Sequence, residues 1–137
     1  MKIITSLIFI LLLITSCTTN TESTSESAII NQAAETTKQL RHIVLFKFKE
    51  TATAENIKAV EEAFAALPSK IKEIKGFEWG KNNSPEGLNK EFTHCFTVTF
   101  DSEEDRAVYL PHPDHQAFVE ILKPYLEDVL VVDYWAE

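Results

Sequence analysis

The pattern of apolar and polar positions after residue 39 predicts a series of short elements. Residues 40–49 and 92–100 alternate between the two kinds, which is the period of a β-strand. Residues 77–81 form a shorter strand, and residues 129–135 are an almost unbroken apolar run that predicts a last strand buried on both faces. Residues 82–90 contain Asn-Asn, Ser-Pro and Gly, which predict a loop between the second and third strands.

Apolar residues recur at helical spacing in two regions, and each region begins at a residue that is suited to cap the N-terminus of a helix. Thr53 begins the first helix, whose apolar side runs through residues 57–67. Pro68 marks a break or a kink, after which the apolar side continues as far as residue 76. Asp101 or Ser102 begins the second region, which runs towards residue 110.

Two prolines interrupt this second region and create an elbow over residues 109–115, Tyr-Leu-Pro-His-Pro-Asp-His. A proline inside a helix removes a backbone hydrogen bond, so the first helix should end near Leu110. Pro113 suits the first position of the next helix, because its missing N–H group would have been unpaired there. Three residues of that helix should face inward: Phe118, Ile121 and Leu122.

The resulting order, β-α-β-β-α-β, is that of a ferredoxin-like α+β fold. It predicts a four-stranded antiparallel sheet with the helices on one face. The other face would carry Ile43, Leu45 and part of the last strand into water, at a cost of roughly 25 cal/mol per Å² of apolar surface. We therefore expect a homodimer in which two such sheets pair through this open face.

The first residues have the form of an export signal. A positive start is followed by an apolar run over residues 3–14, which is shorter than the roughly 20 residues that span a bilayer. Ile14-Thr15-Ser16-Cys17 resembles a bacterial lipobox, and a plain signal peptide with a chance cysteine is the alternative. We expect a signal peptide over residues 1–16, a lipid anchor at Cys17, and a place in the cell envelope. Thr18 instead of Asp follows the cysteine, which under the lipoprotein sorting rule of some Gram-negative bacteria favours the outer membrane or the cell surface over the inner membrane.

Residues 17–39 are rich in Ser, Thr, Asn and Glu and predict a flexible tether before a single domain over residues 40–137. The whole chain carries a net charge of −8, and the domain has 11 basic and 18 acidic residues. Nucleic-acid binding depends on neutralising phosphates, so we expect no nucleic-acid partner. Cys95 has no disulfide partner if Cys17 carries lipid, and the strand pattern predicts that it is a small buried hydrophobe.

The candidate chemistry lies in the elbow and in two strand histidines. An imidazole can give or take a proton near neutral pH, and the elbow brings two of them close to the phenol of Tyr109. Other interpretations stay open: Tyr109 fills the core, His112 only caps a helix, and His42 and His94 are satisfied structural histidines. The spacing of His112 and His115 could reach one metal ion, but it lacks the further ligands of a zinc site, so we expect no metal.

Several motifs together resemble the stress-responsive α/β-barrel (Dabb) domain family of dimeric α+β barrels. They are Arg-His-Ile-Val-Leu-Phe-Lys-Phe at 41–48, Phe-Glu-Trp-Gly at 77–80, Thr-His at 93–94, Phe-Asp-Ser at 100–102, the elbow at 109–115 and Val-Asp-Tyr at 132–134. The Tyr-x-x-His-Pro-x-His element is the most specific of them. The resemblance covers residues 40–135.

The resemblance does not imply one particular activity, because the members of the family differ in this respect. Most members have no established activity, and one plant member closes a polyketide ring by an aldol condensation without a cofactor. Its catalytic residues match His115, which would be the general base, and Tyr109, which would hold the carbonyl. The ligand-binding residues expected around this pair are His42, Val44, Phe46, Phe64, Phe96 and His112.

Two functions therefore remain open at this point. The first is an envelope dimer, stress-related in the sense of its family, that binds a small hydrophobic or carbonyl ligand without turnover. The second is a cofactor-independent lyase, isomerase or cyclase. They differ in whether an open pocket lies beside the elbow or whether aromatic side chains fill it.

Overall fold

The computed structural model describes residues 38–137, so the predictions of a signal peptide, of a lipid anchor at Cys17 and of most of the tether lie outside the described residues. The elements are β1 (Leu40–Phe48), α2 (Ala54–Ala65), the 3-10 helix η1 (Leu67–Ser69), β2 (Gly76–Lys81), β3 (His94–Phe100), α3 (Glu103–Tyr109), α4 (Pro113–Leu122) and β4 (Leu126–Trp135). Within this part of the chain, no helix has the length and apolar character needed to cross a membrane.

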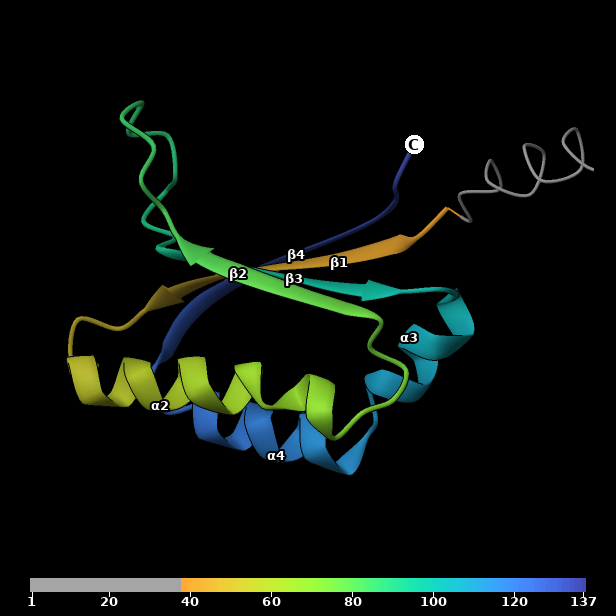
Figure 1. Ribbon diagram of the computed structural model, residues 1–137. Helices are drawn as coiled ribbons and strands as arrows, with labels where there is room; N and C mark the ends of the chain where they lie inside the picture. The colour runs from red at the N-terminus through yellow and green to blue at the C-terminus, as the bar shows by residue number, and fades with distance from the viewer. Residues whose placement is uncertain (1–37) are drawn as a thin grey trace, which may run out of the picture. The chain divides into compact units, whose positions relative to one another are not determined.

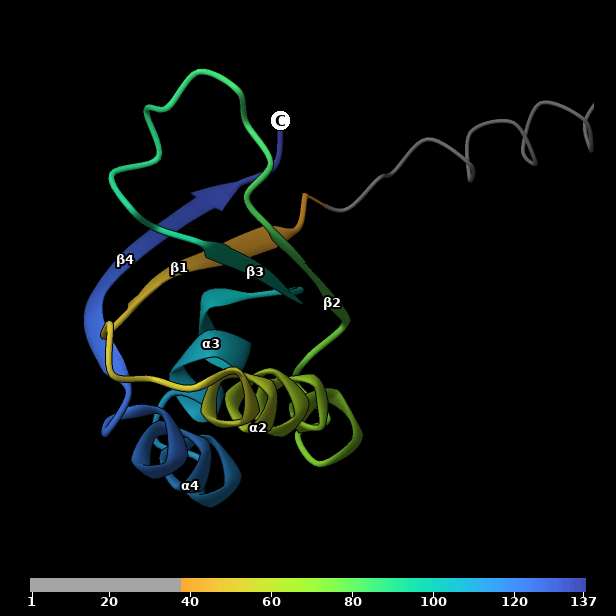
Figure 2. The same ribbon diagram turned by 90° about the vertical axis from the view of Figure 1, so that its left-hand side faces the viewer.

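The four strands form one antiparallel sheet in the order β2-β3-β1-β4. The helices lie under one face of this sheet, with α2 and α4 side by side (Figures 1 and 2). Among residues 38–137, no helix covers the other face, and the loop between β2 and β3 projects from the sheet on that side (Figure 1). The predicted ferredoxin-like α+β fold is confirmed.

The helices begin where the sequence predicted, and the structure shows why. The side chain of Thr53 accepts a hydrogen bond from the N–H of Asn56 in a full capping box, and Ser102 accepts one from the N–H of Asp105. Pro113 is the first residue of α4, and the Nδ1 atom of His112 accepts a hydrogen bond from the next N–H group. His112 is therefore a capping residue, one of the two roles left open for it.

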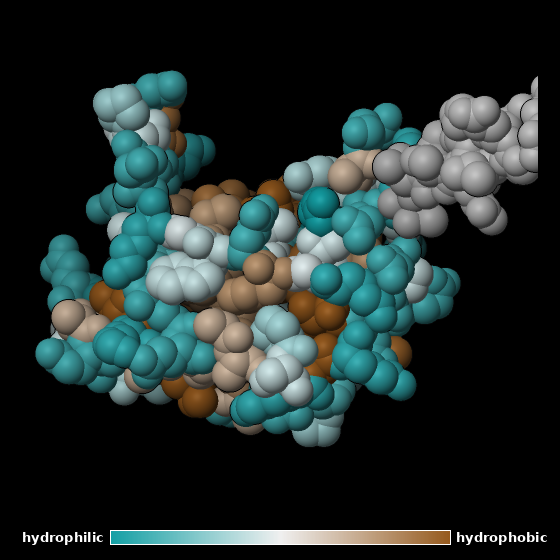
Figure 3. All heavy atoms as spheres, viewed as in Figure 1, coloured by the Kyte–Doolittle hydropathy of each residue, from teal (hydrophilic) through white to brown (hydrophobic). Residues whose placement is uncertain are grey.

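The core lies between the sheet and the helices and is unusually aromatic. Phe46, Phe64 and Phe96 are each at most 1% exposed, and Phe118 is 4% exposed. Their ring centroids lie between 4.4 and 6.4 Å apart, so the four rings form one continuous cluster. Hydrophobic atoms are visible between the helices and the sheet, whereas the outer side of α2 is mainly hydrophilic (Figure 3).

The prediction that the last strand is buried on both faces is wrong. β4 is an edge strand, and Val129, Leu130, Val131 and Val132 are between 42% and 49% exposed. The apolar run arises for another reason: alternate residues of β4 face the helix side of the sheet or its open face.

Three smaller predictions also differ from the structure. Ile121 is 43% exposed, because α4 turns only Phe118 and Leu122 into the core. Cys95 is exposed because it lies on the open face of β3. The first helix ends at Ala65, and the apolar residues beyond Pro68 are buried by irregular chain instead of by a continued helix.

Candidate functional site

A cavity of about 340 Å³ lies between the helices and the half of the sheet formed by β1 and β4. Ten of its fourteen lining residues are apolar. The four polar ones are His42, Tyr109, His115 and Asp133, which come from β1, the end of α3, the first turn of α4 and β4. The fold therefore gathers two imidazoles, a phenol and a carboxylate in an otherwise apolar space, as in many ligand sites.

His115 is held in one tautomer by the backbone of the elbow. Its Nδ1 atom lies 2.9 Å from the carbonyl oxygen of Leu110, which can only accept a hydrogen bond, so Nδ1 carries the proton. Nε2 then carries the lone pair, for which residues 38–137 supply no hydrogen-bond partner. Burial lowers the pKa of His115, and the nearby imidazoles of His42 and His112 lower it further. At neutral pH the residue is therefore an uncharged base.

The Leu110 carbonyl is available because the elbow diverts its usual partner. In a continuous helix it would accept from the N–H of Asp114, but that group donates to His112 instead. The carbonyl accepts from His115 and, at 2.7 Å, from the side-chain amide of Gln116. The elbow thus determines the tautomer of His115 through the Leu110 carbonyl, as well as the path of the chain.

Tyr109 stands beside His115, with the two ring centroids 4.3 Å apart. The side chain is fully buried, and its hydroxyl has no hydrogen-bond partner among residues 38–137. An unpaired buried hydroxyl costs about 1–3 kcal/mol. Burial also raises the pKa of Tyr109, so at neutral pH the hydroxyl keeps its proton and is a hydrogen-bond donor.

His42 is oriented by a carboxylate on the neighbouring strand. Residues 42 and 133 are paired between β1 and β4, and Nδ1 of His42 lies 2.6 Å from Oδ1 of Asp133. The other oxygen of Asp133 accepts a hydrogen bond from Arg106 at 2.8 Å. Sequence reasoning gave Asp133 and Arg106 no role. The available signal was Asp133 itself, the one charged residue in the apolar run 129–135.

The structure brings six of the predicted site residues together around the cavity: His42, Val44, Phe46, Phe64, Tyr109 and His115. It does not bring Phe96 or His112 into the lining. Phe96 is fully buried and stacks on Phe64 with centroids 4.6 Å apart, so it supports the cavity wall from behind.

His94 lies away from this cavity, and both of its ring nitrogens have partners. Nδ1 lies 2.8 Å from the hydroxyl of Thr93, and Nε2 lies 3.0 Å from the carboxylate of Glu61. Within residues 38–137, no three or more His, Cys, Asp or Glu side chains lie close enough together to hold a metal ion.

Residues 40–136 match the family described as the stress responsive A/B barrel domain (Dabb), and the chain belongs to that family. A stress-response A/B barrel domain-containing protein of Arabidopsis thaliana, HS1, is 39% identical over 69% of this chain and 87% of its own length. Olivetolic acid cyclase of Cannabis sativa is 28% identical over 69% of this chain and 94% of its own length.

Solved structures show the same fold. The hydroxynitrile lyase of Passiflora edulis superposes with a TM-score of 0.69 at 25% identity, over 74% of this chain and 95% of that one. A dimeric protein of unknown function with a ferredoxin-like fold from Bacteroides fragilis gives a TM-score of 0.60 at 32% identity, over 72% of this chain and 96% of that one. The fold thus occurs in enzymes and in proteins without a known activity.

Proposed function

We propose that this domain binds a small, largely apolar carbonyl compound in the cavity beside the elbow. The observation that carries the proposal is the unpaired hydroxyl of Tyr109 next to the free Nε2 atom of His115. A carbonyl oxygen would accept from the hydroxyl and remove the cost of burying it without a partner. The apolar lining would then take the hydrocarbon part of the ligand.

A thermal-shift screen of the purified protein against small ketones, aldehydes and aromatic acids tests this proposal. A compound that binds only the folded state stabilises it by mass action and so raises its melting temperature. At a ligand concentration of 100 times the dissociation constant, the free energy of unfolding increases by about 2.7 kcal/mol. We expect His115→Ala to weaken or abolish the shift. Ile121→Ala is the matched control: it shortens an exposed side chain of α4 that does not line the cavity, so it should keep the shift. A screen without any shift would contradict the proposal.

A second candidate function, proton transfer, is favoured by the fixed tautomer of His115. Nε2 would take the proton from the carbon beside the carbonyl. The C–H electron pair would move into the enolate, whose oxygen Tyr109 would stabilise by a hydrogen bond. The names of two similar proteins, a cyclase and a lyase, are those of enzymes. Bound compounds incubated with the protein in D₂O should incorporate deuterium at that carbon, and His115→Ala should remove the incorporation. Equal incorporation by the variant would end this candidate.

We also propose that the chain is a homodimer through the open face of the sheet. Leu130, Val132 and Tyr134 lie on this face of β4 and are 44–46% exposed, and structural neighbours are described as dimeric. Val132→Lys should convert the dimer to a monomer in light scattering after size exclusion. Ile121→Lys places the same charge at an exposed apolar position on α4 and should leave the dimer intact. A monomeric wild-type protein would refute the assignment.

Finally, we propose that the protein is anchored in the cell envelope by lipid at Cys17. The support is the signal-like start and the lipobox-like residues that precede the cysteine. Cells grown with an alkyne-labelled fatty acid should yield labelled wild-type protein in the membrane fraction. The Cys17→Ser protein should carry no label, and labelling that survives this change would exclude Cys17 as the anchor.

A further inference from the structure

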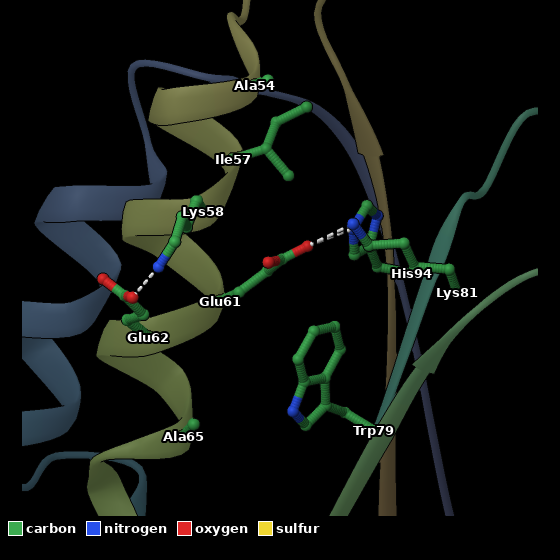
Figure 4. A pocket seen from close by; sticks show the side chains of 9 residues that line it. All are labelled: Ala54, Ile57, Lys58, Glu61, Glu62, Ala65, Trp79, Lys81 and His94. Atoms are coloured by element: carbon green, nitrogen blue, oxygen red, sulfur yellow. Dashed lines mark hydrogen bonds and ion pairs between the residues drawn. The ribbon is translucent and has the colours of Figure 1, made fainter.

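A second hollow lies at the opposite edge of the sheet, between α2 and β2 (Figure 4). Its volume is about 510 Å³, and it shares no lining residue with the cavity beside the elbow. Aromatic contacts run from Trp79 at this hollow through Phe96 to Phe64 at the wall of the first cavity. The two sites therefore stand on the same rigid core but offer different chemistry.

Trp79 supplies a flat, fixed surface in this hollow. Its indole is nearly parallel to the ring of Phe96, at 14° with centroids 5.4 Å apart, so the core determines its orientation. Trp79 is nevertheless 40% exposed, because β2 is an edge strand and no further strand covers it. A large aromatic face that is already in position loses little conformational freedom when a ligand stacks on it.

The polar groups of the hollow surround the carboxylate of Glu61. This side chain reaches from α2 towards β3 (Figure 4), and its Oε1 atom lies 3.0 Å from Nε2 of His94 and 2.9 Å from Nζ of Lys81. Both of these contacts are made by Oε1, which leaves the Oε2 atom for a further donor. Burial raises the pKa of Glu61, but the bonds from Lys81 and His94 outweigh it and hold the pKa below its usual value.

The positive and negative charges of the hollow balance, and both the carboxylates and the ammonium groups can form further hydrogen bonds. Lys58 pairs with Glu62 at the rim, as Lys81 pairs with Glu61 inside, so two cations meet two carboxylates. The Lys81 side chain is 62% exposed and keeps N–H groups for a further acceptor. A purely apolar occupant would leave Oε2 and this ammonium group desolvated without partners, which is costly. A simple anion or cation would meet no net opposite charge.

We propose that this hollow binds a pyranose sugar, either free or at the end of a glycan. The C–H face of the ring would stack on the negative face of the Trp79 indole. A ring hydroxyl, which both donates and accepts, would donate to Oε2 of Glu61 and accept from Nζ of Lys81. A pyranose therefore matches all three protein groups: its C–H face matches the indole, and its hydroxyls match the carboxylate oxygen and the ammonium group.

A glycan array probed with the full-length protein in detergent tests the proposal, followed by fluorescence titration of the bound glycans. Methyl pyranosides are added as competitors, and they separate recognition of a single ring from recognition of a longer chain. We expect saturable binding that Trp79→Ala weakens at least about tenfold. Trp135→Phe is the matched control, because Trp135 is similarly exposed at 37% but does not line the hollow, and it should keep the affinity within about twofold.

Glu61→Gln guards against an effect of folding alone, since Trp79 also packs on Phe96. It keeps the size of the side chain and removes the charge that accepts from the sugar hydroxyl. It should weaken glycan binding at least about threefold and leave the ligand-induced shift at the elbow cavity unchanged. An array on which the wild-type protein binds no glycan would overturn the proposal, as would Trp79→Ala binding as tightly as wild type.

Discussion

Replacing Tyr109 by phenylalanine separates the stability of this protein from its capacity to bind a ligand. The hydroxyl is fully buried and has no hydrogen-bond partner among the described residues. In most proteins, removing a buried hydroxyl breaks a hydrogen bond and destabilises the fold. Here the change removes one oxygen atom whose desolvation is uncompensated, and the ring keeps its contacts with His115 and Phe100.

The expected gain is the cost of the unpaired group, about 1–3 kcal/mol in the free energy of unfolding of the ligand-free protein. For a domain of about 100 residues, 1 kcal/mol corresponds to roughly 4–8 °C in melting temperature. We therefore expect Tyr109→Phe to melt at least about 4 °C higher than wild type. The same variant should lose the melting shift given by carbonyl compounds, because its ring cannot donate to their oxygen.

Urea unfolding at pH 7 and calorimetric melting without ligand measure this effect. Tyr125→Phe is the control: Tyr125 is only partly buried at the margin of the core, and its change should stay within about 0.5 kcal/mol. A loss of 1 kcal/mol or more in Tyr109→Phe would mean that the hydroxyl is bonded in the folded protein. That result would refute the structural basis of the proposed carbonyl site.

Two further predictions concern the groups around Tyr109. Asp133→Asn should lower the free energy of unfolding by about 1 kcal/mol in urea, because Arg106 and His42 lose a charged acceptor that is already partly exposed to solvent; unchanged stability would show that this network contributes nothing. Burial lowers the pKa values of His115 and His94 in the folded state, so the unfolded chain takes up protons first as the pH falls below about 6.5. Stability should therefore decrease from pH 7 towards pH 5, by at most about 1.4 kcal/mol per pH unit for each group, and His115→Gln should have a shallower slope in urea titrations. A variant slope equal to that of wild type would contradict the assigned burial effect.

The elements of the fold could be predicted because local patterns dictate them. The alternation in residues 40–48 and the two prolines of the elbow each leave one reasonable backbone conformation. The exposure of Ile121, Cys95 and the last strand could not be predicted in the same way. These depend on where an element lies in the fold, at an edge or on an uncovered face, and an apolar run is compatible with both.

The candidate site was predictable only in part for the same reason. Tyr109 and His115 are close in sequence, so the elbow alone indicates that they meet. His42 and Asp133 are far apart in sequence, and their pairing follows from the register between β1 and β4, which residue patterns do not specify. Phe96 was expected in the lining because it shares a strand face with other aromatic residues, but close packing against Phe64 buries it behind the wall.

The most direct test of the carbonyl site is the protonation of the two His115 nitrogen atoms, measured by ¹⁵N NMR on histidine-labelled protein at pH 7. The resonances are assigned by comparison with His115→Gln. The structure predicts a protonated Nδ1 and an unprotonated Nε2, and the Nε2 resonance should move when the strongest carbonyl ligand of the thermal screen is added. A proton on Nε2 in the free protein, or a ligand that leaves the His115 resonances unchanged, would contradict the account.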